Sequence, residues 1–217
     1  MARTARVILP GIPHHVTQRG VRSMNVFKEH KDYTAYRELL HTQCKKHGVE
    51  ILAYCLMTNH VHLVAVPETE ESLARAVGET HRLYTRRINF REGVRGWLFQ
   101  GRFFSTPLDE THFLAAIRYV EQNPVRAKMV EKAWDYPFSS APFHAGVAKE
   151  DPVLSGHPLL DEITDWEGFV AATPGEIDTI REKTRTGRPC GDEGFYAMAE
   201  RVTGRSLAPK KPGRRRK

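Results

Sequence analysis

The chain has 217 residues, 40% of them hydrophobic, and carries a formal net charge of +7. This length and composition suit a globular protein with one sizeable core and an appendage, or with two small domains. No apolar run approaches the roughly 20 residues that a membrane-spanning helix needs, and the N-terminus lacks the features of a secretory signal. The three cysteines are far apart and form no CxxC pair, which argues against a disulfide framework or a cysteine zinc site. We therefore expect a cytoplasmic protein that does not contact a membrane.

Charge is distributed unevenly along the chain. Residues 1–148 carry 20 Lys/Arg and 14 Asp/Glu, residues 149–178 carry 1 and 8, and residues 179–217 carry 12 and 4. Two basic segments are thus joined by an acidic one whose Pro and Gly content is typical of a boundary region. Basic proteins commonly bind polyanions, because neutralised phosphates release counterions. Nucleic acid is the favoured partner, although a charge of this size can also serve only to keep a protein soluble.

Hydrophobic periodicity predicts alternating strands and helices over the first 123 residues. Residues 14–20 alternate polar and apolar side chains and end at Gly20, which is typical of a strand. Residues 26–48 have the hydrophobic period of a helix and end at Gly48. For the last helix, Asp109 is a suitable N-cap and Pro124 a stop signal. The expected elements are strand 14–20, helix 26–48, strand 49–57, strand 60–66, helix 71–89, strand 97–108 and helix 109–123.

This order of elements predicts an α+β fold, namely a ferredoxin-like antiparallel sheet with helices packed on one face. Two further short helices are expected within residues 176–203. A basic C-terminal extension would complete the chain.

His60 and His62 lie two positions apart in the strand expected at 60–66. Residues so spaced point to the same side of a strand, about 6.6 Å apart. Both imidazoles would lie on the face covered by helices, where each needs a polar partner. One divalent metal ion would satisfy both, but a His-x-His pair alone is weak evidence, because a lone histidine near a core usually has an ordinary hydrogen-bond partner.

The helix expected at 109–123 carries a tyrosine away from its apolar side. Tyr119 lies about 150° from the centre of the apolar stripe at 100° per residue, and Asn123 lies one turn further on the same side. We therefore expect Tyr119 to have a role outside the core. For Asn123, a role as the turn residue of Asn-Pro is about equally well supported. The apolar stripe consists of Phe113, Leu114, Ile117 and Val120.

Four motifs, in this order and spacing, resemble the HUH single-tyrosine transposases, and most closely the REP-associated tyrosine transposases. They are HHVTQRG, NHVHLV, GWLFQGRFFSTPLD and IRYVEQNPVRAKMV. The resemblance covers about residues 7–145 and extends more loosely to the C-terminal region. It implies that His60 and His62 bind a divalent metal, Mg²⁺ or Mn²⁺, and that Tyr119 is the nucleophile. Asn123 stands where relatives complete the metal site with a polar residue, often glutamine.

The resemblance also implies an HUH endonuclease fold and three parts of the chain. These are a catalytic domain at 1–148, an acidic connecting segment at 149–178, and a basic DNA-binding region and tail at 179–217. The protein would be a monomer or homodimer associated with the nucleoid.

The activity implied is metal-dependent cleavage and strand transfer on single-stranded or hairpin DNA of short palindromic repeats. Tyr119 would form a 5′-phosphotyrosine and release a 3′ hydroxyl. The phosphotyrosine bond retains the energy of the broken phosphodiester bond, so strands could be rejoined without ATP. Two alternatives stay open. One is a catalytically inactive regulator of the same fold that binds repeat DNA, and the other is a metal phosphodiesterase that acts on RNA with water as the nucleophile.

Arginines and lysines from two regions are expected to hold the DNA. Phe103 and Phe104, beside Arg102, could offer stacking surfaces, although a row of arginines is usually a solvated face and the phenylalanines fit a core. The expected DNA-binding residues are Arg19, Arg22, Arg82, Arg86, Arg87 and Arg102 in the first region, and Lys210, Lys211, Arg214, Arg215 and Arg216 in the tail.

Overall fold

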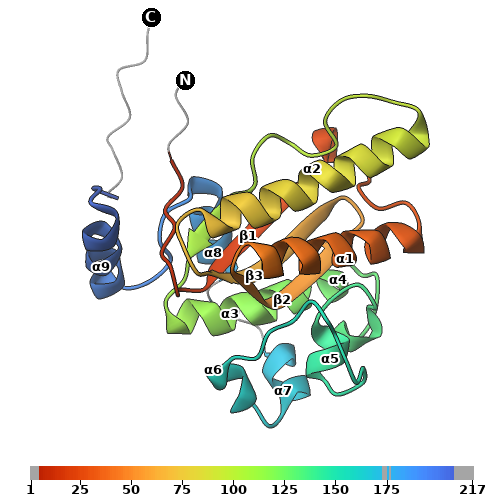
Figure 1. Cartoon of the computed structure of the whole chain (residues 1–217). Coiled ribbons are helices and arrows are strands. Elements are labelled where there is room, and N and C mark those ends of the chain that lie inside the picture. Colours follow the sequence, from red (N-terminus) through yellow and green to blue (C-terminus); the bar gives the residue numbers. More distant parts are fainter. Residues whose placement is uncertain (1–4, 173–174, 176, 208–217) are drawn as a thin grey trace, which may run out of the picture.

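The structure is a computed structural model of the chain and describes residues 5–172, 175 and 177–207. Within these residues four strands form an antiparallel sheet in the order β2-β3-β1-β4 (Figure 1). This is the order of a ferredoxin-like sheet, so the predicted α+β fold class is confirmed. The strands are β1 (His14–Arg19), β2 (Val49–Met57), β3 (His60–Pro67) and β4 (Phe104–Pro107).

The β2–β3 hairpin forms as the two predicted strands at 49–57 and 60–66 imply, and β2 is buried on both faces. Along β3, Val61, Leu63 and Ala65 pack into one core, whereas Val64 packs into a second core on the opposite face. His60 and His62 share the side of Val64, because side chains two apart point the same way. The free edge of β2 is covered by the later chain, since Ser155 N donates to Ile51 O and Leu56 N donates to Phe138 O.

Two long helices, α1 (His30–Lys46) and α2 (Ser72–Glu92), cover the face of Val61, Leu63 and Ala65. Their buried aromatic side chains, Tyr36 and Tyr84, are among the largest fully buried groups of the structure.

Helix α3 (Glu110–Glu121) packs on the other face, so the prediction that the helices lie on one face is wrong (Figure 1). The physical reason is that β2 and β3 are apolar on both sides and each side must be shielded from water. Buried Glu121 holds the following segment to α3, because it accepts hydrogen bonds from Ser140, His144 and the Trp166 indole. The helices after α3 are α4 (Asn123–Arg126), α5 (Ala141–His144), α6 (Pro158–Asp161), α7 (Trp166–Ala171), α8 (Ile177–Thr186) and α9 (Glu193–Thr203).

The two short helices expected near the C-terminus are present as α8 and α9. Helix α9 and Leu207 after it pack against Val7 and Leu9 of the N-terminal segment. Helix α8 contacts α3, β1 and β4. Because of these contacts, α8 belongs to the same packed body as the sheet. The boundary expected after residue 178 falls inside this helix. The division of the chain into three functional parts stays a prediction.

Three expected boundaries differ from the structure. Helix α1 begins at His30 and not at residue 26, because Glu29 and Asp32 form a capping box there. The strand expected at 97–108 is reduced to β4, since Gly101 has a φ of 55° and interrupts the extended chain. Pro124 does not end the helical path but lies in the first turn of α4, where its missing N–H costs nothing. In the described part of the chain, no helix is both long and apolar enough to cross a membrane.

Buried neutral histidines should make the fold sensitive to acid. His81 bonds to the Tyr36 hydroxyl through Nε2 at 3.0 Å, and burial lowers its pKa to about 3. Between pH 6.5 and 3 the His81 side chain is therefore protonated in the unfolded chain but neutral in the folded protein. Protonation thus favours the unfolded state, and the free energy of unfolding falls as the pH drops below 6.5. In His81→Gln, the decrease of the unfolding free energy between pH 6 and 4.5 should be shallower by about 1.4 kcal/mol per pH unit. Urea unfolding at several pH values would measure it, and an unchanged slope would contradict this assignment.

Candidate active site

One cavity is lined by the predicted nucleophile and all the predicted metal ligands. It has a volume of about 430 Å³ and lies between the outer face of β1 and β3 and helices α3 and α8. His60, His62, Tyr119 and Asn123 all line it, and so does Arg19. Residues of α8 that also line it are Arg181, Thr184 and Arg185.

The two histidines present one free ring nitrogen each. His60 Nδ1 bonds to Asn59 Oδ1 at 2.6 Å, and His62 Nδ1 bonds to His15 Nε2 at 2.9 Å. Their ring centres are 4.9 Å apart, and neither Nε2 takes part in a hydrogen bond with another described residue. Burial lowers the pKa of His60 to about 4 and that of His62 well below its usual value. Both rings are therefore neutral at pH 7, which is the form that binds metals.

Tyr119 is buried in the apolar cluster around α3, so the prediction that it lies outside the core is wrong. The physical reason is that α8 covers the side of α3 that the sequence pattern left open to solvent. The Tyr119 hydroxyl is 3.5 Å from Arg181 Nε, and its ring meets the His62 ring edge-on with centres 5.4 Å apart. The guanidinium carbons of Arg126 and Arg181 lie 4.9 and 5.6 Å from the ring centre. The phenol ring thus contacts the His62 imidazole and has two guanidinium groups beside it.

Asn123 has the structural role that the sequence left open, and its role as a metal ligand stays a prediction. Its Nδ2 donates to the carbonyl oxygens of Tyr119 and Val120, at 2.8 and 3.3 Å, so it satisfies the end of α3. Its carboxamide also lines the cavity. With Nδ2 engaged, Oδ1 is the atom available as a ligand.

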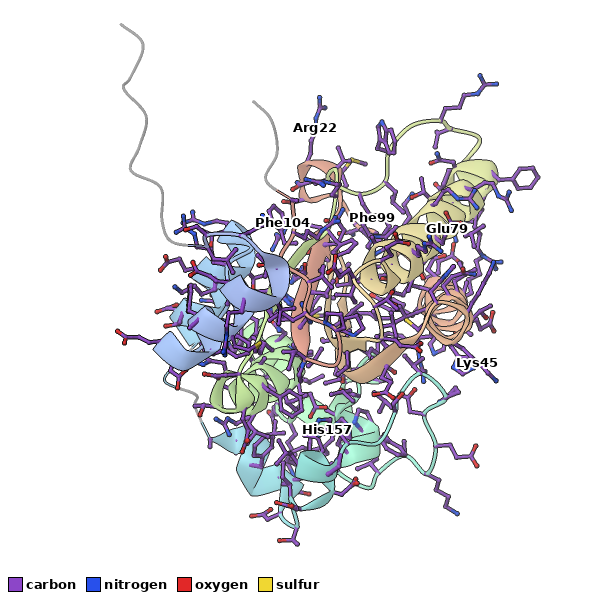
Figure 2. All side chains as sticks on the ribbon, turned by 60° about the vertical axis from the view of Figure 1, so that its left-hand side comes forward. Arg22, Lys45, Glu79, Phe99, Phe104 and His157 are labelled. Carbon is purple, nitrogen blue, oxygen red and sulfur yellow. The ribbon has the colours of Figure 1, made fainter. Side chains whose placement is uncertain are left out.

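The expected DNA-binding arginines are only partly gathered at this cavity. Arg102 lines an adjoining cavity of about 250 Å³, which shares Gln100, Phe104 and Arg185 with the first. Arg22 is exposed and points away from the body of the protein, whereas Phe104 lies between the sheet and the C-terminal helices (Figure 2). Phe103 is buried, as the core interpretation expected.

Three arginines of α2 lie on the opposite side of the sheet. Arg82 is paired with Glu79 at 2.8 Å, and Arg86 and Arg87 line a groove between α1 and α2. The structure does not bring them to the cavity, and their role in DNA binding stays a prediction. The tail residues Lys210, Lys211, Arg214, Arg215 and Arg216 lie outside the described residues.

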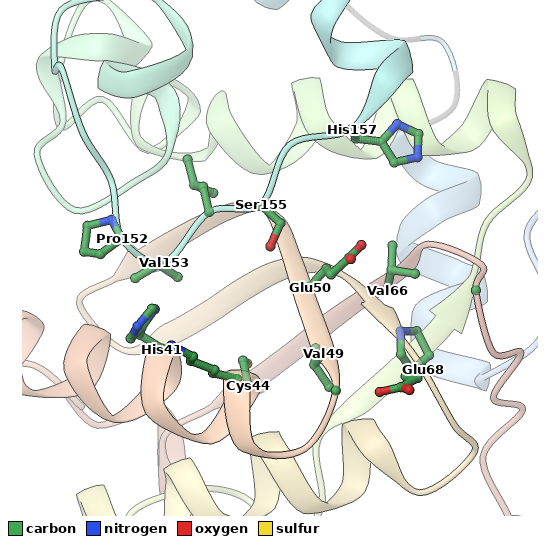
Figure 3. Close-up of a pocket in the computed structure, with 15 residues that line it drawn as sticks. His41, Cys44, Val49, Glu50, Val66, Glu68, Pro152, Val153, Ser155 and His157 are labelled. Atoms are coloured by element: carbon green, nitrogen blue, oxygen red, sulfur yellow. The ribbon is translucent and has the colours of Figure 1, made fainter.

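A larger cavity elsewhere lacks this combination of groups. It has a volume of about 720 Å³ and lies between α1, β2 and residues 152–157 (Figure 3). Burial raises the pKa of its Cys44 thiol to about 12, so the thiolate nucleophile is scarce at neutral pH. No three His, Cys, Asp or Glu side chains in the described part of the chain are grouped to hold a metal ion.

Sequence reasoning missed several residues of the site, among them His15, Arg181 and Thr184. His15 is on the same side of β1 as Arg19, which strand alternation predicts, but its contact with His62 depends on the register between β1 and β3. Arg181 and Thr184 lie on α8, and the sequence gives no local sign that this helix covers Tyr119.

Comparisons with known proteins identify the family and the fold. The family model described as "Transposase IS200 like" matches residues 11–123. A REP-associated tyrosine transposase of Haemophilus influenzae is 26% identical over 126 residues, which cover 53% of this chain and 70% of the relative. A solved structure of a REP-associated tyrosine transposase bound to a REP hairpin has a TM-score of 0.58 and 19% identity, and the match covers 72% of this chain and 93% of that one; it shows the same fold. Because the family match spans more than half of the chain and includes β1, β3 and α3 with His60, His62 and Tyr119, the chain belongs to the IS200-like transposase family.

Proposed function

We propose that the protein is a metal-dependent single-strand DNA endonuclease and strand transferase that acts on hairpins of short palindromic repeats. The observation that carries the proposal is that Tyr119, His60 and His62 line one cavity. The solved relative bound to a REP hairpin supports the choice of substrate.

The donor atoms fit a divalent metal. His60 and His62 would hold it through Nε2, and Asn123 Oδ1 would be the third protein ligand. Two imidazoles and one amide oxygen suit Mn²⁺ and accept Mg²⁺. When bound, such an ion supplies Lewis-acid neutralisation of the phosphate oxygens and of the leaving 3′ oxygen.

Tyr119 would be the nucleophile. Its oxygen forms a bond to phosphorus as the bond to the 3′ oxygen breaks. The phenol loses its proton and the leaving 3′ oxygen gains one, so the step releases a 3′ hydroxyl and leaves the 5′ side of the strand on the protein. Arg181 donates toward the Tyr119 oxygen, so it orients this oxygen and adds positive charge beside an incoming phosphate. Because the phosphotyrosine conserves a phosphodiester bond, the reverse attack by a 3′ hydroxyl rejoins strands without ATP.

The adjoining cavity offers a path for the strand. Arg6 and Arg102 both line it, and burial together with the neighbouring Arg102 charge lowers the pKa of Arg6 to about 10. Two positive charges side by side attract phosphates. Phe104, with 46% of its surface exposed, offers a ring on which a base can stack. The basic tail would add affinity that does not depend on sequence.

The nucleophile is tested by trapping the covalent product. Labelled hairpin DNA incubated with the protein and Mn²⁺ should give an adduct on a denaturing gel, and Tyr119→Phe should lose it, because the attacking oxygen is gone. Tyr196→Phe removes the same atom from α9, outside the cavity, and should keep the adduct. Cleavage that survives Tyr119→Phe would support the water nucleophile of a phosphodiesterase, and wild-type binding without cleavage would support an inactive regulator.

The metal site is tested with His60→Ala. Removal of one imidazole should abolish the adduct and the increase of Tm by Mn²⁺, while DNA affinity falls less than about threefold because the phosphate contacts remain. The exposed α1 variant His41→Ala is the matched control and should behave as wild type. If His60→Ala keeps its response to Mn²⁺, this metal site is wrong.

The role of the tail is tested by deletion of residues 208–217. This removes six Lys/Arg, so the dependence of DNA affinity on salt should become shallower. Titrations at several NaCl concentrations would measure the slope, and an unchanged slope would show that the tail does not neutralise phosphates.

A further inference from the structure

We propose that Thr184, His15 and Asn59 are positioning residues that fix which ring nitrogen of His60 and His62 carries the proton. This inference rests on the proposed function for the metal, but the hydrogen bonds that carry it belong to the protein alone. A neutral imidazole has one N–H and one lone pair. A metal can bind Nε2 only if the proton is on Nδ1.

The His62 proton is fixed by a chain of hydrogen bonds that ends on a backbone carbonyl of α8. Thr184 Oγ1 lies 2.7 Å from Ile180 O, and a carbonyl can only accept, so the hydroxyl donates there. Thr184 Oγ1 must then accept from His15 Nδ1, which lies 2.8 Å away. With its proton on Nδ1, His15 accepts at Nε2 from His62 Nδ1. The polarity of every link therefore follows from the carbonyl.

The contact between the two imidazoles has the geometry of a genuine hydrogen bond. The His15 and His62 ring planes differ by 6°, and their centres are 5.2 Å apart while the two nitrogens are 2.9 Å apart. The rings therefore meet edge to edge through these nitrogens, and the N–H of one can point along the lone pair of the other.

A second chain fixes His60 in the same way. Asn59 Nδ2 donates to Ser23 O at 3.2 Å, so Asn59 Oδ1 is the acceptor that faces His60 Nδ1 at 2.6 Å. Two independent chains thus place the proton of both histidines on Nδ1. Both Nε2 lone pairs are left for a metal, and the docking of α8, which lies beyond the family match, controls one of them.

The protonation pattern can be tested in the metal-free protein. Nitrogen-15 NMR of labelled histidine at pH 7.5 should show His62 protonated on Nδ1 in the wild type. Thr184→Val removes the hydroxyl at nearly constant volume, leaves His15 Nδ1 without its acceptor, and should populate the form of His62 protonated on Nε2. Thr184→Ser restores the hydroxyl and should restore the wild-type spectrum. If His62 in Thr184→Val stays fully protonated on Nδ1, or if wild-type His62 is protonated on Nε2, the inference is overturned.

Metal affinity gives a second readout. Calorimetric titration with Mn²⁺ should show weaker binding by about 10- to 100-fold in Thr184→Val, with Thr184→Ser close to wild type. Thr186→Val is the matched control, because Thr186 is an exposed residue of the same helix whose hydroxyl bonds only to helix carbonyls. Equal affinity in Thr184→Val and Thr186→Val would contradict the inference while leaving the metal site intact. Failure of the wild type to bind Mn²⁺ would instead count against the proposed function, and the NMR result would still decide the hydrogen-bond chain.

Discussion

The register between β1 and β3 is the constraint on which the site depends. It sets Thr17 opposite His62 and Arg19 opposite His60, so the imidazoles face α3 and α8 and meet His15. A slip by one residue would turn both histidines into the core beneath α1 and α2 and turn apolar side chains outward. Burial of Val61, Leu63 and Ala65 on the inner side therefore stabilises the register that exposes the histidines to the cavity.

The two faces of the sheet serve different purposes. Beneath α1 and α2 the core is built from large apolar and aromatic groups, and polar side chains there, such as His81, bond to neighbours within it. Beneath α3 and α8 the face is mixed, because imidazoles, a phenol and guanidinium groups surround a cavity. The stable face lets the other hold several ionisable groups close together, an arrangement that costs stability.

Local sequence patterns predicted much of this structure. Apolar strand-like runs predicted the β2–β3 hairpin, and strand alternation predicted the shared side of His60 and His62. Helical periodicity did not predict that Tyr119 lies in the apolar cluster around α3. Packing between distant segments could not be found in this way. The side of the sheet on which α3 packs depends on the two-sided burial of β2, and the covering of Tyr119 by α8 joins residues 62 positions apart. The short β4 reflects the left-handed conformation of Gly101, which a propensity argument overlooked.

A crystal structure of the Tyr119→Phe protein with Mn²⁺ and hairpin DNA, using the anomalous signal of manganese, would test the central claim most directly. The ion should lie between His60 Nε2 and His62 Nε2, with the phosphate to be cleaved touching both the ion and the ring of residue 119. An ion bound elsewhere, or a strand that passes the cavity without its phosphate entering, would contradict the account.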